Sequence, residues 1–232
     1  MSAIFRLDRA REALFDGCGR RFDAAQRAWQ DASVAPTGDT VDAVTAATWQ
    51  QRESGHPIRI PIGVIGPREA LPAQLAAAEQ VGRGLAQIGY AVVCGGRHGV
   101  MEAVCRGASN AGGTTIGILP DADPSFANPY VGIVIATGIG EARNALIARA
   151  AFCLVAIGDS FGTLSEVAFG RQFGKLVLGL EGAARVEGVV HVADVGAALH
   201  EIALVALALG RQTDAGCHGA RQNRPFPSST NL

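Results

Sequence analysis

Residues 152–166 read Phe-Cys-Leu-Val-Ala-Ile-Gly-Asp-Ser-Phe-Gly-Thr-Leu-Ser-Glu. The apolar run at 152–157 predicts a buried strand, and the residues after it predict a glycine-bearing turn that opens into a helix near Thr163. The first turn of a helix has backbone N–H groups without intrahelical partners and carries the positive end of the helix dipole. Such a junction favours anions, and Gly162 lets the backbone approach a ligand closely. We therefore expect this turn to form the floor of a site.

Two further junctions of this kind lie upstream. The apolar residues 91–94 lead into Gly-Gly-Arg-His-Gly at 95–99, and residues 60–65 lead into Gly-Pro-Arg-Glu at 66–69. In a parallel sheet the carboxyl ends of the strands lie at one edge. The three loops are therefore expected to line a single crevice.

Between residues 58 and about 209, strand-like apolar runs alternate with segments of helical periodicity. This alternation predicts a Rossmann-like, doubly wound α/β fold with a mainly parallel sheet and helices on both faces. We expect strands near 60–65, 90–94, 114–119, 131–136, 152–157 and 175–180, and helices near 71–88, 98–111, 140–150, 162–173 and 196–209.

Segments of different character flank this part of the chain. Residues 1–57 have only short apolar stretches interrupted by glycine and proline. We expect them to form a small, partly ordered appendage that packs against the main domain or a neighbouring subunit. Residues 58–210 are the predicted ligand-binding domain, and the polar, proline-bearing residues 211–232 predict a flexible tail.

The composition argues against several classes of function. The formal net charge is −1 and the basic residues are dispersed, so we expect no nucleic-acid partner. No run reaches the roughly 18 apolar residues of a membrane span, and no signal-peptide pattern opens the sequence, so we expect a cytoplasmic protein without a membrane partner. Five cysteines suit a reducing compartment, and the spacing of Cys94, His98 and Cys105 matches no usual zinc pattern, so we expect no metal site.

Arginine is the expected phosphate ligand, because Lys175 is the only lysine among the 20 basic residues. Arg68, Arg97 and Arg143 follow predicted strands, and we expect them to contact anionic oxygens while Thr163 donates from the start of the helix. The other predicted contacts to a small phosphate-bearing ligand are Gly66, Gly95, Gly96, Gly99, Thr137, Gly138, Asn144, Ser160, Gly162 and Glu166.

The order and spacing of several motifs resemble a known superfamily. The motifs are Gly-Gly-Arg-His-Gly-Val-Met-Glu-Ala at 95–103, Ala-Gly-Gly-Thr-Thr-Ile-Gly-Ile-Leu-Pro at 111–120, Thr-Gly at 137–138, Ala-Arg-Asn at 142–144 and Gly-Thr-Leu-Ser-Glu at 162–166. Over about residues 60–200 the chain resembles the Rossmann-like superfamily of molybdenum-cofactor carrier proteins and LOG phosphoribohydrolases, often labelled lysine decarboxylase-like. Gly-Gly-Arg at 95–97, Asn-Pro-Tyr at 128–130 and Arg-Asn at 143–144 resemble the carrier branch more closely.

The two branches imply different functions at the same crevice. The carrier branch implies binding of molybdenum cofactor, a phosphate-bearing pterin, or of a nucleotide-like ligand, without turnover. The LOG branch implies hydrolysis of the N-glycosidic bond of a nucleoside 5′-monophosphate to base and ribose 5-phosphate, with Arg143 and Glu166 as the catalytic pair. Both branches imply a homodimer or homotetramer.

Departures from the LOG pattern favour binding over turnover. Asn144 replaces a lysine, and Gly-Asp-Ser at 158–160 replaces Pro-Gly-Gly, which adds a negative charge and restricts positive φ angles in the turn. Other interpretations remain open: Thr163 and Glu166 fit a capping box, and Arg143 fits an ion pair with Glu166 or Glu141. We expect a binding protein, with a hydrolase and a structural or regulatory module with a vestigial site as alternatives.

Overall fold

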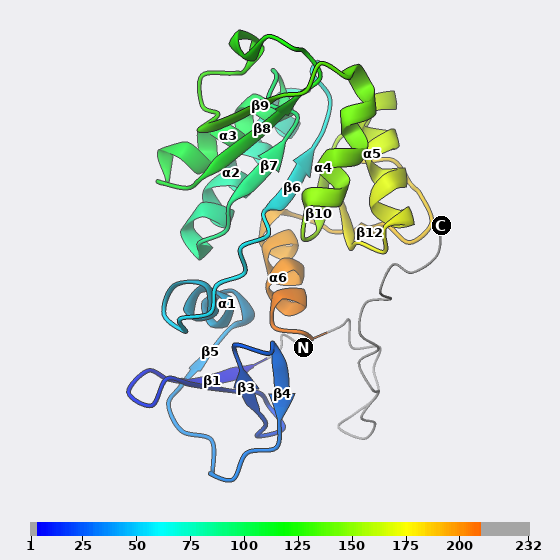
Figure 1. The fold of residues 1–232 in the computed structure, drawn as a ribbon. Helices are drawn as coiled ribbons and strands as arrows, with labels where there is room; N and C mark the ends of the chain where they lie inside the picture. The colour runs from blue at the N-terminus through cyan, green and yellow to red at the C-terminus, as the bar shows by residue number, and fades with distance from the viewer. Residues whose placement is uncertain (1–3, 210–232) are drawn as a thin grey trace, which may run out of the picture.

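The computed structural model describes residues 4–209, and its larger sheet has seven parallel strands in the order β12-β11-β10-β6-β7-β8-β9 (Figure 1). The predicted doubly wound, Rossmann-like α/β fold is thereby confirmed. The strands are β6 (Ile62–Ile65), β7 (Val92–Cys94), β8 (Thr115–Leu119), β9 (Ile133–Ala136), β10 (Leu154–Ile157), β11 (Val177–Leu180) and β12 (Val190–His191).

Helices cover both faces of this sheet. Together with two short 3₁₀ turns they are α2 (Pro72–Ile88), α3 (Val100–Asn110), η1 (Pro124–Phe126), η2 (Gly140–Arg143), α4 (Asn144–Ala150), α5 (Phe161–Gln172) and α6 (Val195–Ala206). One hydrophobic cluster lies on each face of the sheet. The first packs the sheet against α2, α3 and α6, and the second packs it against α4 and α5. Among residues 4–209, no helix has the length and apolarity needed to cross a membrane.

Residues 4–57, here called the N-terminal module, form a second, smaller sheet followed by a helix. The antiparallel strands run in the order β4-β3-β2-β1-β5. The elements are β1 (Phe5–Asp8), β2 (Ala13–Phe15), β3 (Arg21–Asp23), β4 (Ala28–Gln30), β5 (Asp39–Val41) and α1 (Ala43–Arg52). The sequence did not predict these strands, because three or four residues are too few for a clear alternation of apolar and polar positions. The predicted tail at 211–232 lies outside the described residues.

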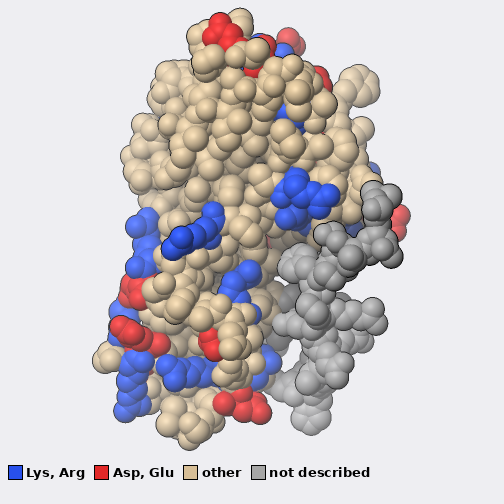
Figure 2. All heavy atoms as spheres, in the orientation of Figure 1, with Lys and Arg blue, Asp and Glu red and all other residues tan. Residues whose placement is uncertain are grey.

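The module is attached to the ends of two helices of the larger sheet. Arg27 donates to two of the last carbonyl oxygens of α6, and Trp29 Nε1 donates to the carbonyl oxygen of Leu207 at 2.7 Å. Arg52 donates in the same way to the last carbonyls of α2. These bonds satisfy acceptors that a helix leaves unpaired at its C-terminus. Charged side chains of both signs gather over the module in Figure 2, whereas much of the surface above it is uncharged.

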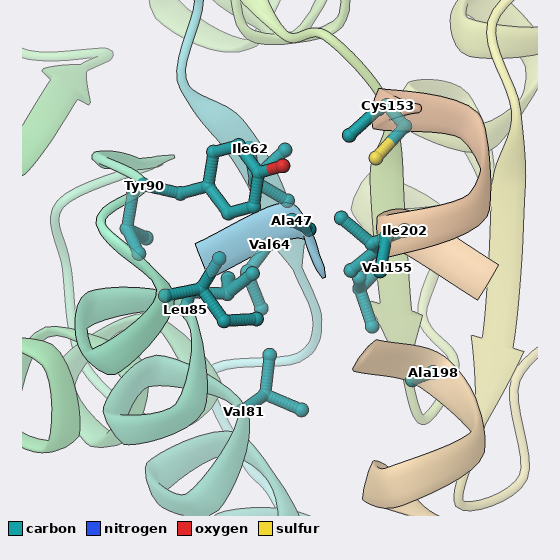
Figure 3. Packing of buried hydrophobic residues seen from close by; sticks show 14 of the residues in the cluster. Ala47, Ile62, Val64, Val81, Leu85, Tyr90, Cys153, Val155, Ala198 and Ile202 are labelled. Atoms are coloured by element: carbon teal, nitrogen blue, oxygen red, sulfur yellow. The ribbon is translucent and has the colours of Figure 1, made fainter. Parts of the chain in front are cut away.

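The core between the sheet and α2 and α6 follows the two-residue period of the strands. Val64 of β6 and Val155 of β10 point to the side where Leu85 of α2 and Ile202 of α6 lie (Figure 3). The neighbouring residue Ile65 packs in the cluster on the opposite face. Each central strand is therefore buried on both sides, which explains why it appears in the sequence as a continuous apolar run.

The chain order creates one switch point in the sheet. From β6 the chain builds outward through β7, β8 and β9, and then returns to place β10 on the other side of β6. The loops that follow β6 and β10 therefore diverge toward opposite faces. A crevice between them is the usual ligand position in open α/β sheets.

The observed strand boundaries differ from the predicted ones in a regular way. Five of the six predicted strands begin two residues later than expected, as in 154–157 against 152–157, and the strand predicted at 114–119 begins one residue later. Most of the first residues of these runs are apolar, but they precede the parallel ladder; Thr114 and Lys175 are the polar exceptions. The predicted helix at 140–150 is divided into η2 and α4, and β12 was missed because it has only two residues.

Two glycines allow α2 and α3 to pack with their backbones in contact. A Cβ atom added at Gly107 would lie 2.0 Å from the carbonyl oxygen of Glu79, and one added at Gly82 would lie 2.1 Å from that of Val104. Because both neighbours are backbone atoms, a side chain at either position forces the helices apart.

We expect Gly107→Ala to lower the free energy of unfolding by about 2 kcal/mol, even though alanine has the higher helix propensity. Urea denaturation followed by circular dichroism measures this change. The matched control is Gly162→Ala in α5, where the added Cβ would lie 3.8 Å from Ser160 Oγ and should cause no loss. Equal stability of Gly107→Ala and the unsubstituted protein would contradict the proposed contact.

Candidate functional site

A cleft of about 530 Å³ opens at the carboxyl ends of β6 and β10, at the switch point of the sheet. Its volume is in the usual range for small-ligand sites. The loop after β6, the start of α5 and the junction of η2 with α4 form its walls. The lining residues are Gly66, Pro67, Arg68, Glu69, Met101, Glu141, Arg143, Asn144, Asp159, Ser160, Gly162, Thr163 and Glu166.

The structure brings together the predicted site residues that follow β6 and β10 and those at the start of α4. The predicted residues that line the cleft are Gly66, Arg68, Arg143, Asn144, Ser160, Gly162, Thr163 and Glu166, and those that do not are Gly95, Gly96, Arg97, Gly99, Thr137 and Gly138. The loop after β7 therefore lies behind the wall of this cleft.

Two glycines of that loop make space for the wall. A Cβ atom at Gly95 would lie 2.6 Å from both terminal nitrogens of Arg143, and one at Gly99 would lie 2.2 Å from the carbonyl oxygen of Arg68. Gly95 thus makes room for the guanidinium group, and Gly99 allows the loop after β6 to pack on the start of α3.

Arg97 and Thr137 make contacts near the carboxyl ends of β8 and β9. The Arg97 guanidinium pairs with the carboxylate of Asp121 and lies 5.5 Å from the ring centroid of Phe126. Thr137 Oγ1 donates to the carbonyl oxygen of Leu119 at 2.6 Å. Both side chains are therefore held by contacts with residues that do not line the cleft.

Arg143 is the most deeply placed cation of the cleft. It ends η2, and its side chain is only 4% exposed. Nη1 lies 3.3 Å from Oε1 of Glu166, while Nε has no hydrogen-bond partner among the described residues. Burial lowers the pKa of the guanidinium, but its ordinary value is so high that the group keeps its positive charge. A fixed positive charge therefore lies under the cleft.

Glu166 faces Arg143 from α5. Burial raises the pKa of its carboxyl group to about 8, and this effect outweighs the opposing influence of the Arg143 charge. The capping-box interpretation is wrong, because Ser160 caps the helix: Ser160 Oγ accepts from the backbone N–H of Thr163 at 3.1 Å. The helix begins at Phe161, so Glu166 lies beyond the capping turn.

Asn144 is held in one orientation by α5. Ser165 Oγ donates its only hydrogen to the carbonyl oxygen of Gly162 at 2.7 Å, so it must accept from Asn144 Nδ2, which lies 2.8 Å away. The amide oxygen, Oδ1, is buried and has no hydrogen-bond partner among residues 4–209. Asn144 therefore contributes an unpaired acceptor to the wall.

The turn before α5 needs one positive φ angle. Gly158 has φ +69°, and a Cβ atom there would lie 2.5 Å from Gln74 Nε2. Ser160 is extended, and Asp159 is not among the residues with positive φ. The expectation that Asp159 and Ser160 restrict the backbone is thus wrong, although Asp159 does bring a negative charge to the cleft.

Sequence analysis did not single out Met101, which lines the cleft from the first turn of α3. In the sequence it appeared only within the glycine-rich motif at 95–103. Glu141 also lines the cleft, and it pairs with Arg68 at 3.3 Å across the mouth. Within the described part of the chain, no three histidine, cysteine, aspartate or glutamate side chains are arranged to hold a metal ion.

Comparison with known proteins agrees with the predicted resemblance. The solved structure of the molybdenum cofactor binding protein from the phototrophic bacterium Rippkaea orientalis is 34% identical and has a TM-score of 0.61, covering 64% of this chain and 98% of that one. The molybdenum cofactor carrier protein of Chlamydomonas reinhardtii is 36% identical with a TM-score of 0.58, covering 66% of this chain and all of that one. An uncharacterized protein of Archaeoglobus fulgidus is 38% identical over 128 residues, which are 55% of this chain and 84% of the relative.

The family model that matches residues 59–206 describes the SLOG cluster4 family. This range contains the larger parallel sheet, the helices on both its faces and the cleft. With the carrier-protein structures above, the match confirms the resemblance predicted from the glycine-rich motifs. The chain belongs to the SLOG cluster4 family.

Proposed function

We propose that this protein binds a small phosphate-bearing ligand of pterin or nucleotide type, such as molybdenum cofactor, and holds it intact in the cleft. The observation that carries this proposal is the buried, charged Arg143 in a cleft that is lined by the loops on both sides of the switch point. The similarity to molybdenum cofactor carrier proteins supports the ligand class.

The start of α5 and two arginines suit a phosphate group. The first N–H groups of α5 have no partner within the helix, and Ser160 occupies only that of Thr163. Arg68 is about half exposed at the mouth, where a phosphate can compete with Glu141 for it. Arg143 adds positive charge from below, and its burial strengthens that field. These groups together favour an anion at the mouth.

The state of Glu166 argues against hydrolysis. A carboxylate that stabilises positive charge on a ribose must be ionised and must face the sugar. Glu166 is 6% exposed, its oxygen Oε1 is bonded to Arg143, and its raised pKa keeps a large part of it protonated at neutral pH. The presence of the Arg143–Glu166 pair at the cleft nevertheless makes a LOG-like hydrolase the competing function to test.

We also propose that the protein forms a homodimer or homotetramer, as the carrier resemblance implies. All residues of the edge strand β9 are exposed, and they include Ile133 and Ile135. On α5, Phe161 is 94% exposed and Leu164 lies one turn further along. Apolar surface of this extent is usual at subunit contacts.

The decisive experiment is a thermal-shift panel of molybdenum cofactor, nucleoside monophosphates and dinucleotides, followed by an assay for released base. A ligand that binds the native state raises the thermal midpoint. We expect stabilisation by molybdenum cofactor or a nucleotide and recovery of that ligand intact. Release of base and ribose 5-phosphate, lost in Glu166→Gln, would establish the hydrolase instead. Absence of any shift would leave the vestigial-site alternative.

We expect Arg143→Gln to weaken binding of the stabilising ligand at least tenfold, because it removes the buried charge that attracts phosphate. Isothermal titration calorimetry measures the change. Arg149→Gln is the matched control, since Arg149 is exposed, does not line the cleft and lies over the ring of Phe173. Circular dichroism checks that both variants fold. Unchanged affinity in a folded Arg143→Gln would contradict the assignment.

Ligand affinity should fall as pH rises through about 8. Above this pH Glu166 becomes anionic and repels a phosphate that is already a dianion above about pH 6. We expect a loss of about tenfold between about pH 7 and pH 9, measured by calorimetry in buffers of equal ionic strength. The Glu166→Gln variant should bind with little pH dependence over this range.

The same group predicts the pH dependence of stability. The pKa of Glu166 is higher in the folded protein than its ordinary value of 4.5, so the folded state binds the proton more tightly. The stabilisation is complete below about pH 4.5 and is lost progressively as pH rises through about 8. The thermal midpoint should therefore fall more steeply with pH in the unsubstituted protein than in Glu166→Gln. Parallel curves would contradict the raised pKa.

A further inference from the structure

Strand β9 forms one edge of the seven-stranded sheet, and none of the described residues pairs with its outer side (Figure 1). It is as long as the central strands β6 and β10, yet all four of its residues are exposed, with Ile133 at 49% and Ile135 at 45%. Proteins usually protect an exposed edge strand with charged side chains or proline. Residues 131–140 contain neither, so this apolar edge has no such protection.

The hydrogen bonds between β8 and β9 show which backbone groups of β9 face the open edge. The N–H group of Thr137, directly after β9, donates to the last carbonyl oxygen of β8. Alternate residues of a strand direct their N–H and C=O groups to opposite sides, so Ile133 and Ile135 also bond to β8. Val134 and Ala136 therefore present both their N–H and their C=O groups to the open edge.

An antiparallel copy of the same strand matches these groups. Two-fold symmetry is the usual relation in a homodimer, and it brings the same surface of both subunits together. If Val134 of one copy pairs with Ala136 of the other, both outward-facing residues of each strand form hydrogen-bonded pairs, and the two Ile135 residues meet on the axis. Registers shifted by two residues would need Gly132 or Gly138, whose N–H groups already donate within the chain. The backbone of β9 thus favours one register of self-pairing.

We propose that two copies of this protein associate through β9, which pairs antiparallel with β9 of the second copy and continues the sheet across the two-fold axis. This inference rests on the proposed homodimer or homotetramer and names its interface. The contacts across the axis are apolar, Val134 with Ala136 and Ile135 with Ile135. Because the two sheets run in opposite directions, the two clefts open at opposite edges of the joined sheet, and each copy binds its own ligand. Phe161 on α5 lies outside this contact and is available for a second one in a homotetramer.

The first test is the self-association of Ile135→Lys, measured by analytical ultracentrifugation. Two like charges would face each other on the axis, so we expect the dissociation constant of the contact to rise at least tenfold, and a homotetramer to yield dimers. Val34→Lys is the matched control, because Val34 is an exposed apolar residue of the N-terminal module, and it should associate like the unsubstituted protein. Circular dichroism checks that both variants fold.

The outcomes of this test separate the interface from the oligomer. An unsubstituted protein that sediments as a monomer would overturn both the proposed oligomer and the β9 contact. An oligomer that Ile135→Lys leaves intact would overturn the β9 contact alone, and Phe161→Lys would then test the start of α5 as the interface.

The variant Ile135→Cys tests the register. Facing residues of a non-hydrogen-bonded antiparallel pair have Cα atoms about 4.5 Å apart, a distance that a disulfide spans. Mild oxidation should therefore link Ile135→Cys chains into dimers that dithiothreitol separates, as seen by non-reducing electrophoresis. Val134→Cys is the control, since its two copies lie two residues out of register and should link no more than the unsubstituted protein. Equal linkage of the two variants, or no linkage of Ile135→Cys, would overturn the proposed pairing.

Discussion

The buried pair of Arg143 and Glu166 joins the two halves of the doubly wound sheet. Arg143 arrives from the half that ends at β9, and Glu166 belongs to the helix that follows β10 on the other side of β6. Glu166 supplies a hydrogen-bond acceptor to the buried guanidinium, while burial raises the pKa of the carboxyl group itself. The absence of a side chain at Gly95 is what gives the guanidinium its place. The shape of the cleft therefore depends on a contact between residues 23 positions apart.

The electrostatics of the cleft follow from this contact. A carboxyl group with a pKa of about 8 can carry a proton or a charge at physiological pH, so the charge of the cleft adjusts to its content. Ser165 holds Asn144 by a hydrogen bond rather than by charge. Hydrolysis requires one group that acts as an acid and another that acts as a base. A largely protonated Glu166 and a neutral, oriented Asn144 agree better with binding of an intact ligand.

The sequence was sufficient to predict the parallel sheet, its helices and the edge at which the cleft lies, because buried parallel strands give continuous apolar runs. It also identified Arg143 and Glu166 through a resemblance of motifs. It could not show that the loop after β7 lies outside the cleft lining. In a sequence, a glycine that makes room for Arg143 cannot be distinguished from a glycine that lets the backbone approach a ligand. The strands of the N-terminal module were missed because each has only three or four residues, and because the pairing of β1 with β5 joins segments more than 30 residues apart in sequence.

The attachment of the N-terminal module has a consequence for spectroscopy. The two tryptophans of the chain, Trp29 and Trp49, both belong to the module, and Trp29 is bonded to the end of α6. Helix α2 has 17 residues and so is about 25 Å long; the loop that leads into it lines the cleft, and its last turn is bonded to Arg52. Tryptophan emission therefore reports on the docking of the module rather than on the occupancy of the cleft.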